Sequence, residues 1–203
     1  MKTKFLVCIT IALLIFGTFG FAHAIVLDFE GEGFVDGTNL GATEYGGFEW
    51  SSNIFSRTEG DYNGSWGNTV EFVSRDIAIY NGRGDMTVSV SGSLFSFDGA
   101  YFTTWSNFDE YSNNSSSTIT MLGYLDGVLV NSITYELSNS FEYYAANFNG
   151  IDQIAFQSSG EGKWWLMDNM AVNSSPVPEP STIVLMGLGL VGLAGLCRKK
   201  IKK

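Results

Sequence analysis

The residues of this chain that could do chemistry are almost all carboxylates. The sequence has one histidine, His23, and two cysteines, Cys8 and Cys197, and all three lie in the segments at the two ends. Between Ile25 and Ser175 neither residue type occurs. That stretch therefore cannot form a zinc site of Cys and His, a Ser-His-Asp triad or a Cys-His dyad.

The carboxylates are numerous enough to change what the domain can bind. Residues 25–175 contain 20 acidic and four basic residues, a net charge of −16. Such a domain repels phosphate backbones, which excludes nucleic acid as a partner, and it attracts cations such as Ca²⁺. Among so many acids, a pair at the spacing a glycosidase needs arises by chance. No catalytic residue is predicted.

The elements that must position these side chains are short strands. Runs of β-forming residues separated by Gly, Asn and Asp predict about eleven or twelve strands, one of them at Thr69–Val73. Asp98-Gly99 and Asp126-Gly127 each separate two such runs, which predicts two hairpins. Asp36–Thr43 and Arg57–Gly67 are predicted as long Gly-rich loops. The pattern predicts an all-β fold, an antiparallel jelly-roll β-sandwich.

The first 24 residues have the three parts of a signal peptide. Lys2 and Lys4 precede an uncharged apolar run, Phe5–Phe21, and Ala22-His23-Ala24 fits the small-x-small rule of signal peptidase. We expect cleavage after Ala24, with an uncleaved N-terminal anchor as the alternative. The folded domain is then residues 25–175.

Residues 176–203 have a second tripartite pattern. Val177-Pro178-Glu179-Pro180 leads into the apolar stretch Ile183–Cys197, which five cations follow: Arg198, Lys199, Lys200, Lys202 and Lys203. As a helix the apolar stretch reaches about 22 Å, short of a hydrocarbon core of about 30 Å, so it spans a membrane only marginally. The cations act as a basic stop and should stay in the cytoplasm. The alternative is a plain C-terminal tail anchor.

The order of these three parts resembles the PEP-CTERM tag of Gram-negative bacteria. The resemblance implies that an exosortase recognises and processes the tag at the inner membrane. It also implies that the protein accompanies exopolysaccharide or biofilm matrix.

The middle of the chain is similar to exported jelly-roll domains related to carbohydrate-binding modules. The segments that carry this likeness are Leu27–Gly31, Phe97–Phe102, Gly123–Gly127, Gly150–Phe156 and Trp165–Met170. In many such domains the first and last strands share a structural Ca²⁺. The resemblance therefore implies Asp28, Glu30 and Asp168 as calcium ligands.

Asp168 stands out among these because Leu166 and Met170 flank it at i−2 and i+2 and should share its face of the strand. A carboxylate on an apolar face needs a partner. The partner is either Ca²⁺ or backbone N–H groups, unless the residue lies at an exposed edge.

Three tryptophans are candidates for stacking on a sugar ring. Trp164 and Trp165 are consecutive in a predicted strand and must point to opposite faces, so only one can enter the core. Trp66 lies in a Gly-rich loop. For each of them, packing in the core or under a loop is the alternative.

Together these observations predict an exported, non-catalytic protein of the cell surface or extracellular matrix. It would be held transiently in the inner membrane with its domain in the periplasm, and it would associate with extracellular polysaccharide. An adhesin or protein-interaction module is the alternative, and a polysaccharide-modifying hydrolase is a third.

Overall fold

The computed structural model describes residues 23–31, 33–42, 44–66, 70–82, 84–90, 93–106 and 112–174. Within them are one α-helix, α2 (Glu59–Trp66), and two 3-10 helices, η1 (Leu40–Ala42) and η2 (Ser112–Asn114). The strands are β1 (His23–Leu27), β2 (Glu49–Trp50), β3 (Ile54–Thr58), β4 (Ile77–Asn81), β5 (Met86–Ser89), β6 (Phe95–Thr104), β7 (Thr118–Leu125), β8 (Val128–Glu136), β9 (Glu142–Ile151), β10 (Gln153–Ser158) and β11 (Trp165–Ser174). No helix within these ranges has the length and apolarity needed to cross a membrane.

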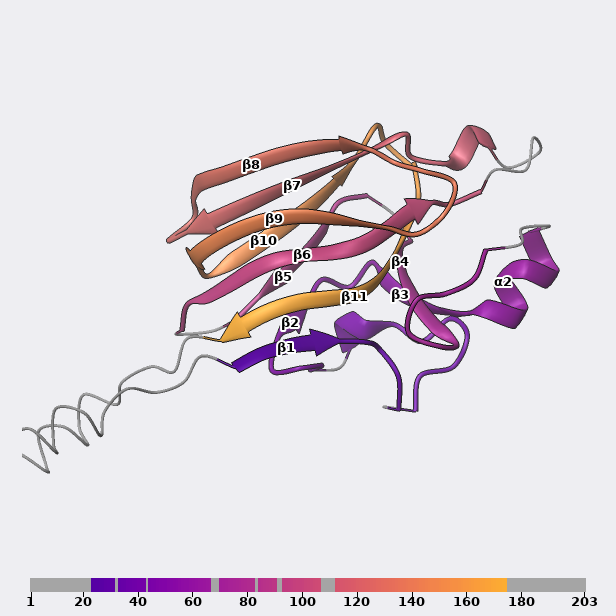
Figure 1. Cartoon of the computed structure of the whole chain (residues 1–203), viewed down its shortest axis with the longest axis horizontal. Helices are drawn as coiled ribbons and strands as arrows, with labels where there is room; N and C mark the ends of the chain where they lie inside the picture. Colours follow the sequence, from indigo (N-terminus) through magenta and orange to yellow (C-terminus); the bar gives the residue numbers. More distant parts are fainter. Residues whose placement is uncertain are drawn as a thin grey trace, which may run out of the picture. The chain divides into compact units, whose positions relative to one another are not determined.

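The strands form two antiparallel sheets, as the sequence predicts. One has the order β3-β4-β11-β6-β9, with β1 also paired to β11, and the other has the order β2-β5-β10-β7-β8. The sheets lie face to face (Figure 1). Consecutive strands lie in opposite sheets, except in the pairs β3–β4 and β7–β8. The prediction of an all-β sandwich is confirmed.

Alternating apolar residues fill the space between the sheets. In β11, Trp165 and Met167 point into this core, and in β10 Ile154 and Phe156 face them from the other sheet. Aromatic rings dominate it, as in Phe102, whose ring lies 5.4 Å from that of Trp165. Edge contacts of this kind stabilise a core beyond the apolar area that they bury.

A second, smaller core lies on the outer face of the six-stranded sheet, under α2. Its fully buried members include Tyr62, Trp105 and Leu166. The hydroxyl of Tyr62 donates a hydrogen bond to the carbonyl oxygen of Trp105. This outer face is therefore covered at the end of the sandwich where α2 lies.

Helix α2 corrects the prediction of a loop over Arg57–Gly67. Thr58 is the N-cap of this helix, because its Oγ1 accepts a hydrogen bond from the backbone N–H of Asp61 at 3.3 Å. The glycines that follow in the sequence had favoured a loop instead. Glu59 and Asp61 lie in the first turn, where carboxylates favour the helix dipole. Burial of Tyr62 then supplies tertiary support that a short Gly-containing helix lacks by itself.

The two predicted hairpins have different outcomes. The Asp126-Gly127 hairpin is confirmed: both residues have positive φ, 50° and 75°, and they join β7 to β8. The Asp98-Gly99 hairpin is wrong, because β6 runs without a break from Phe95 to Thr104. The register of β6 with β9 shifts just before Gly99, so this glycine lies at an irregularity between two strands.

Replacing Gly99 with alanine should destabilise the fold, because a Cβ there would lie 2.4 Å from the carbonyl oxygen of Tyr144. The φ of 153° adds backbone strain. We expect a loss of about 2 kcal/mol in the free energy of unfolding, typical of overpacking. Urea denaturation followed by circular dichroism measures it.

The same substitution at Gly60 is the matched control. Gly60 lies in α2 with open space where a Cβ would be, so Gly60→Ala should stabilise the helix by about 0.5–1 kcal/mol. Equal effects of the two substitutions would contradict this account of Gly99.

Candidate functional site

Asp168 is a fully buried carboxylate on the outer face of β11. The backbone N–H groups of Val73 and Ser74 donate to its Oδ2 at 2.8 and 2.9 Å. The N–H of Asn169 donates to its Oδ1 at 2.7 Å. Burial raises the pKa of Asp168 from 3.8 to about 6, and these hydrogen bonds oppose the rise. Of the partners left open by the sequence, the structure has the backbone N–H groups.

The position of Asp168 follows from a change of partner along β11. Leu166 and Met167 pair with β4, and β11 pairs with β1 from Met170 onward. Between these two pairings Asn169 has a φ of 46°, and the register with β6 shifts. The extra residue reverses the alternation of side chains, as in a β-bulge. Met170 consequently lies in the main core rather than on the face of Asp168, which corrects the sequence prediction.

Glu30 holds the same segment of chain as Asp168. Its Oε1 accepts hydrogen bonds from the N–H groups of Asp76 and Ile77, at 2.8 and 2.7 Å, and from the Ser74 hydroxyl at 3.2 Å. Two carboxylates, one just after the first strand and one on the last strand, thus fix Val73–Ile77 by its backbone. This segment overlaps the predicted strand Thr69–Val73, whose described residues, Val70–Val73, are irregular rather than extended in a sheet.

Asp28 does not join the other two carboxylates. Its Oδ1 accepts from the N–H of Glu30 at 3.1 Å and from the hydroxyl of Tyr45 at 3.5 Å. In the described part of the chain no three His, Cys, Asp or Glu residues are grouped so that they could hold a metal ion. Calcium binding by Asp28, Glu30 and Asp168 stays a prediction of the sequence, whereas the backbone hydrogen bonds of Asp168 and Glu30 favour a fold that does not depend on the ion.

The tryptophans named as sugar contacts have different surroundings. Trp165 is completely buried between the sheets, which corrects the expectation that a sugar could reach its ring. Trp164 points to the opposite face, as predicted, and packs edge-on against Trp105 at 5.1 Å. Trp164 is only partly buried. The side chain of Trp66 lies outside the described residues.

Polar side chains that the sequence analysis did not single out lie on the outer face of the five-stranded sheet, on both sides of the apolar pair Leu122–Ala155. Tyr124 of β7 lies opposite Gln153 of β10, and Thr120 lies opposite Gln157. Their neighbours in sequence, such as Met121 and Ile154, fill the core. The signal for this surface was the alternation of polar and apolar residues along β7 and β10. Amide and hydroxyl groups of this kind can donate and accept hydrogen bonds to a polyhydroxylated ligand.

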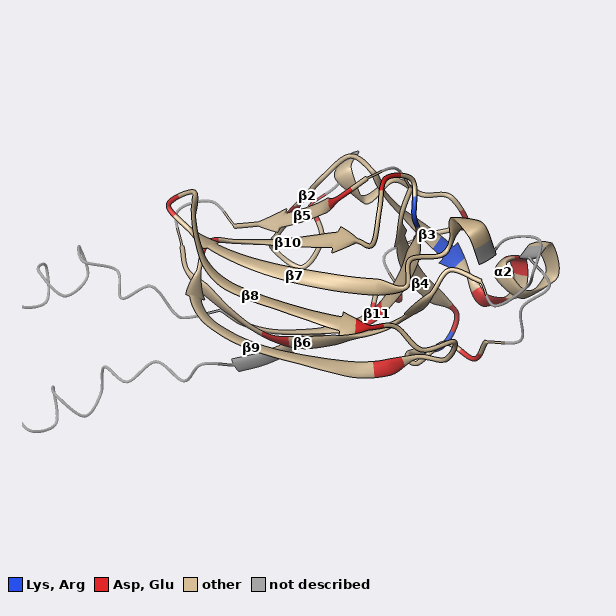
Figure 2. Cartoon of the chain, turned by 90° about the horizontal axis from the view of Figure 1, so that it is seen from above, with Lys and Arg blue, Asp and Glu red and all other residues tan. Residues whose placement is uncertain are grey.

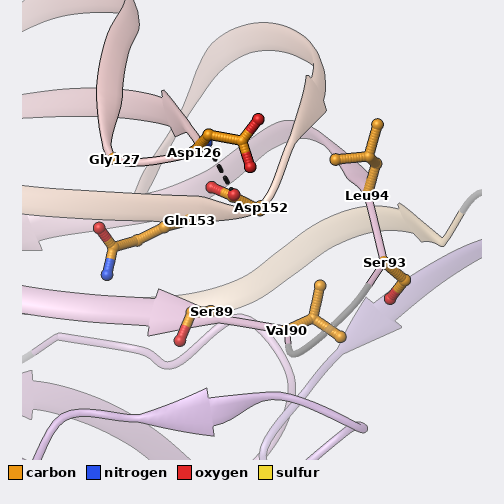
Figure 3. Close-up of a pocket in the computed structure, with 8 residues that line it drawn as sticks. All are labelled: Ser89, Val90, Ser93, Leu94, Asp126, Gly127, Asp152 and Gln153. Carbon is orange, nitrogen blue, oxygen red and sulfur yellow. Dashed lines mark hydrogen bonds between the residues drawn. The ribbon is translucent and has the colours of Figure 1, made fainter.

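A pocket of about 610 Å³ opens at one end of this polar face. Ser89, Gln153 and the two carboxylates of Asp126 and Asp152 line it together with Val90, Ser93, Leu94 and Gly127 (Figure 3). The N–H of Asp126 donates to Asp152 Oδ2 at 2.9 Å, which ties the β7–β8 turn to the β9–β10 turn. We call the outer face of β7 and β10 together with this pocket the polar face.

Comparison with known proteins identifies the C-terminal segment. Residues 176–199 match the PEP-CTERM protein-sorting motif. The chain therefore carries this motif, as its sequence pattern indicates. The motif lies outside the described residues. No curated protein matches the sequence significantly.

Three solved structures resemble the chain at low sequence identity. A DUF4465 family protein from Bacteroides caccae has 10% identity and a TM-score of 0.49, over 75% of this chain and 100% of its own. A mutant of the family 29 carbohydrate-binding module CBM29-2 has 15% identity and a TM-score of 0.39, over 79% and 96%. The K2 adhesin domain of Lys-gingipain has 8% identity and a TM-score of 0.42, over 73% and 97%. Likenesses at this level identify neither a family nor a ligand for this chain.

The raised pKa of Asp168 makes its contribution to stability dependent on pH. The folded chain binds this proton more tightly than the unfolded chain, because the pKa is about 6 when folded against 3.8 ordinarily. Protonation of Asp168 therefore stabilises the fold, and this contribution is lost as pH rises through about 6. Between pH 7 and pH 5 the gain is about 1 kcal/mol.

Asp168→Asn is the reference for this measurement, because the variant keeps every other titrating group of the chain. Urea denaturation of both proteins at pH 5 and pH 7 gives the two differences in free energy of unfolding. The native chain should gain about 1 kcal/mol over the variant on going to pH 5. An unchanged difference, or one of opposite sign, would contradict the burial of this carboxylate.

Proposed function

We propose that this chain is an exported, non-catalytic protein of the cell envelope or extracellular matrix that an exosortase sorts through its C-terminal tag. The observation that carries the proposal is the PEP-CTERM motif at residues 176–199. The motif follows closely after Ser174, where the last strand ends. A folded domain that runs directly into a sorting tag is the arrangement expected of a sorted cargo.

The proposed route begins with signal peptidase at the N-terminus. Cleavage after Ala24 would leave Ile25–Leu27 of β1 to pair with Met170–Val172 of β11. The short apolar segment Ile183–Cys197 and the basic stop at Arg198, Lys199 and Lys200 would then hold the chain in the inner membrane until exosortase acts. The final location would be the cell surface or the extracellular matrix.

Within that location we propose that the domain associates with extracellular polysaccharide, as part of an exopolysaccharide or biofilm matrix. Support comes from the polar face, where side chains such as Gln153, Gln157 and Tyr124 lie on a regular sheet. Alternation of consecutive strands between the two sheets supports the jelly-roll connectivity that the sequence analysis expected. Because the domain has a charge of −16, it would bind an acidic polysaccharide through Ca²⁺ ions that bridge the carboxylates of the two partners.

A protein-interaction module is the alternative, since a polar sheet can equally bind a protein surface. The hydrolase alternative would use two carboxylates in a cleft. Asp126 and Asp152 are a described pair that lines a pocket. Asp152 already accepts a hydrogen bond from the backbone of Asp126, which suits a structural role better than proton transfer.

Replacing Glu179 with glutamine should impair sorting, because it removes the only charge between the two prolines of the motif. In a Gram-negative host with an exosortase, we expect the native chain to be shortened and released. The variant should stay in the membrane fraction at its unprocessed mass. Mass spectrometry of both fractions gives the masses and both cleavage sites.

Glu161→Gln is the control, since Glu161 is an exposed acid in the turn before β11. It should be processed like the native chain. Intact native polypeptide in the soluble cytoplasm, with its last lysine present, would contradict both export and sorting.

Replacing Tyr124 and Gln153 together with alanine should weaken binding to a matrix polysaccharide about tenfold or more, because one aromatic contact and one amide contact are removed. Tryptophan fluorescence during titration with purified polysaccharides, with and without Ca²⁺, measures the affinity. Tyr143→Ala is the matched control: this tyrosine is 45% exposed but lies on the other sheet.

If both variants weaken polysaccharide binding equally, the binding site is not on the polar face. No response to any polysaccharide would remove the glycan proposal and favour a protein partner. Release of reducing ends during the titration, abolished by Asp126→Asn, would favour the hydrolase.

A further inference from the structure

Most of the exposed large apolar side chains gather at one end of the sandwich. Nine such side chains are exposed in the described part of the chain, and six of them belong to β1, β8 and the segment before β6. These six, which we call the apolar end, are Ile25, Val26, Leu94, Val128, Leu129 and Val130. The other three are Val35, Val73 and Tyr143. Apolar side chains that gather at one end of a domain mark an interaction site more often than scattered single residues do.

Two neighbouring pockets connect the members of the apolar end. One pocket, of about 200 Å³, is lined by Ile25, Leu94 and Val172 together with Phe48 and Phe95. Leu94 also lines the larger pocket beside Asp126 and Gly127, and Val128 follows that turn directly. The apolar end therefore has one group beside β1 and another at the start of β8, and the pocket with Asp126 and Asp152 lies between them. In Figure 1 the starts of β1, β6 and β8 and the end of β11 lie at the same end of the sandwich.

Both ends of the chain leave the sandwich from this same place. β1 begins at His23 and β11 ends at Ser174, and these two residues are paired. Eight residues, 175–182, separate Ser174 from the apolar stretch that begins at Ile183. The nine steps from Ser174 to Ile183 span at most about 32 Å when fully extended. While that stretch is in a membrane, Ser174 cannot be farther than this from its first residue.

The charges of the apolar end exclude an electrostatic attraction to anionic headgroups. Asp126 and Asp152 line the pocket beside it, and Asp98 accepts a hydrogen bond from Asn173, which pairs with Ala24 of β1. The described basic residues, Arg57, Arg75 and Lys163, lie elsewhere, and Figure 2 shows no Lys or Arg at the β7–β8 turn. Contact with a membrane would therefore be apolar and weak by itself. A short tether makes weak contacts effective by raising the local concentration.

We propose that the apolar end docks on the lipid surface of the membrane that holds the C-terminal tag. This rests on the proposed function, because it needs the tag in the membrane. Docking keeps the sandwich upright on the bilayer and the motif that follows Ser174 close to the interface where a membrane enzyme acts. Cleavage of the tag removes the tether, and the domain then leaves because its apolar contact is too weak alone.

The test uses the full chain in liposomes of zwitterionic phosphatidylcholine that contain a spin-labelled lipid. Cys8→Ser and Cys197→Ser provide a cysteine-free background. A single cysteine then replaces Leu129, or Val35 as the control, and carries a fluorescent label. Val35 is even more exposed than Leu129, 64% against 50%, and it lies outside the apolar end.

We expect the label at Leu129 to lose about half of its fluorescence or more to the spin-labelled lipid, and the label at Val35 to keep its fluorescence. A second label position, Val26→Cys, should behave like Leu129→Cys. Circular dichroism confirms the fold of each variant, which is expected because all three positions are exposed.

Flotation of the same liposomes separates this proposal from the one on which it rests. Chain that floats with the liposomes without quenching at Leu129 overturns the lipid contact alone. Equal quenching at Leu129 and Val35 overturns it too, since the contact is then not confined to one end. Protection of Leu129 from iodide without lipid quenching identifies a second copy as the occupant, again overturning it. If the chain does not float with the liposomes, both the membrane anchoring by the tag and the docking of the apolar end are wrong.

Discussion

The pairing of the first and last strands, with two carboxylates beside it, is the constraint on which the rest of this structure depends. β11 pairs with β4 along its first half and with β1 along its second. Where the partner changes, Asp168 and Glu30 accept backbone N–H groups of Val73–Ile77. An unsatisfied carboxylate buried there would be costly. The segment therefore lies across the outer face of β11, next to the second core under α2.

This arrangement decides which surfaces are left for function. Coverage of the six-stranded sheet at the α2 end leaves the outer face of the five-stranded sheet as the broad regular surface available to a ligand. The same pairing brings His23 and Ser174 together, so the two targeting segments leave from one end. The common exit of the two targeting segments beside the apolar end is thus a consequence of where β11 lies.

The sequence predicted those features that depend on local patterns. The alternating runs indicated the sandwich, Asp126-Gly127 indicated its hairpin, and the consecutive tryptophans Trp164 and Trp165 indicated opposite faces. Where tertiary packing decides, the pattern misled. Asp98-Gly99 looks like a hairpin turn, yet Gly99 allows close approach of β9 within a continuous strand.

The candidate site was harder to predict than the fold. A carboxylate between apolar residues showed that Asp168 needed a partner, but not that the partner is the backbone of a segment about 95 residues away in sequence. The sequence indicates tryptophans as sugar contacts by residue type alone. Whether a ring can stack on a sugar depends on its exposure, and Trp165 is completely buried. The Gln, Thr and Tyr side chains on the outer face of β7 and β10 have no distinguishing pattern in the sequence, and only the register of the two strands brings them together.

The measurement that tests the central claim most directly is thermal unfolding of the purified chain with excess EDTA and with added Ca²⁺. Because backbone N–H groups satisfy Asp168 and Glu30, the melting temperature should be the same in both. A lower melting temperature in EDTA that Ca²⁺ restores would contradict the account, since a metal ion would then be holding the first and last strands together.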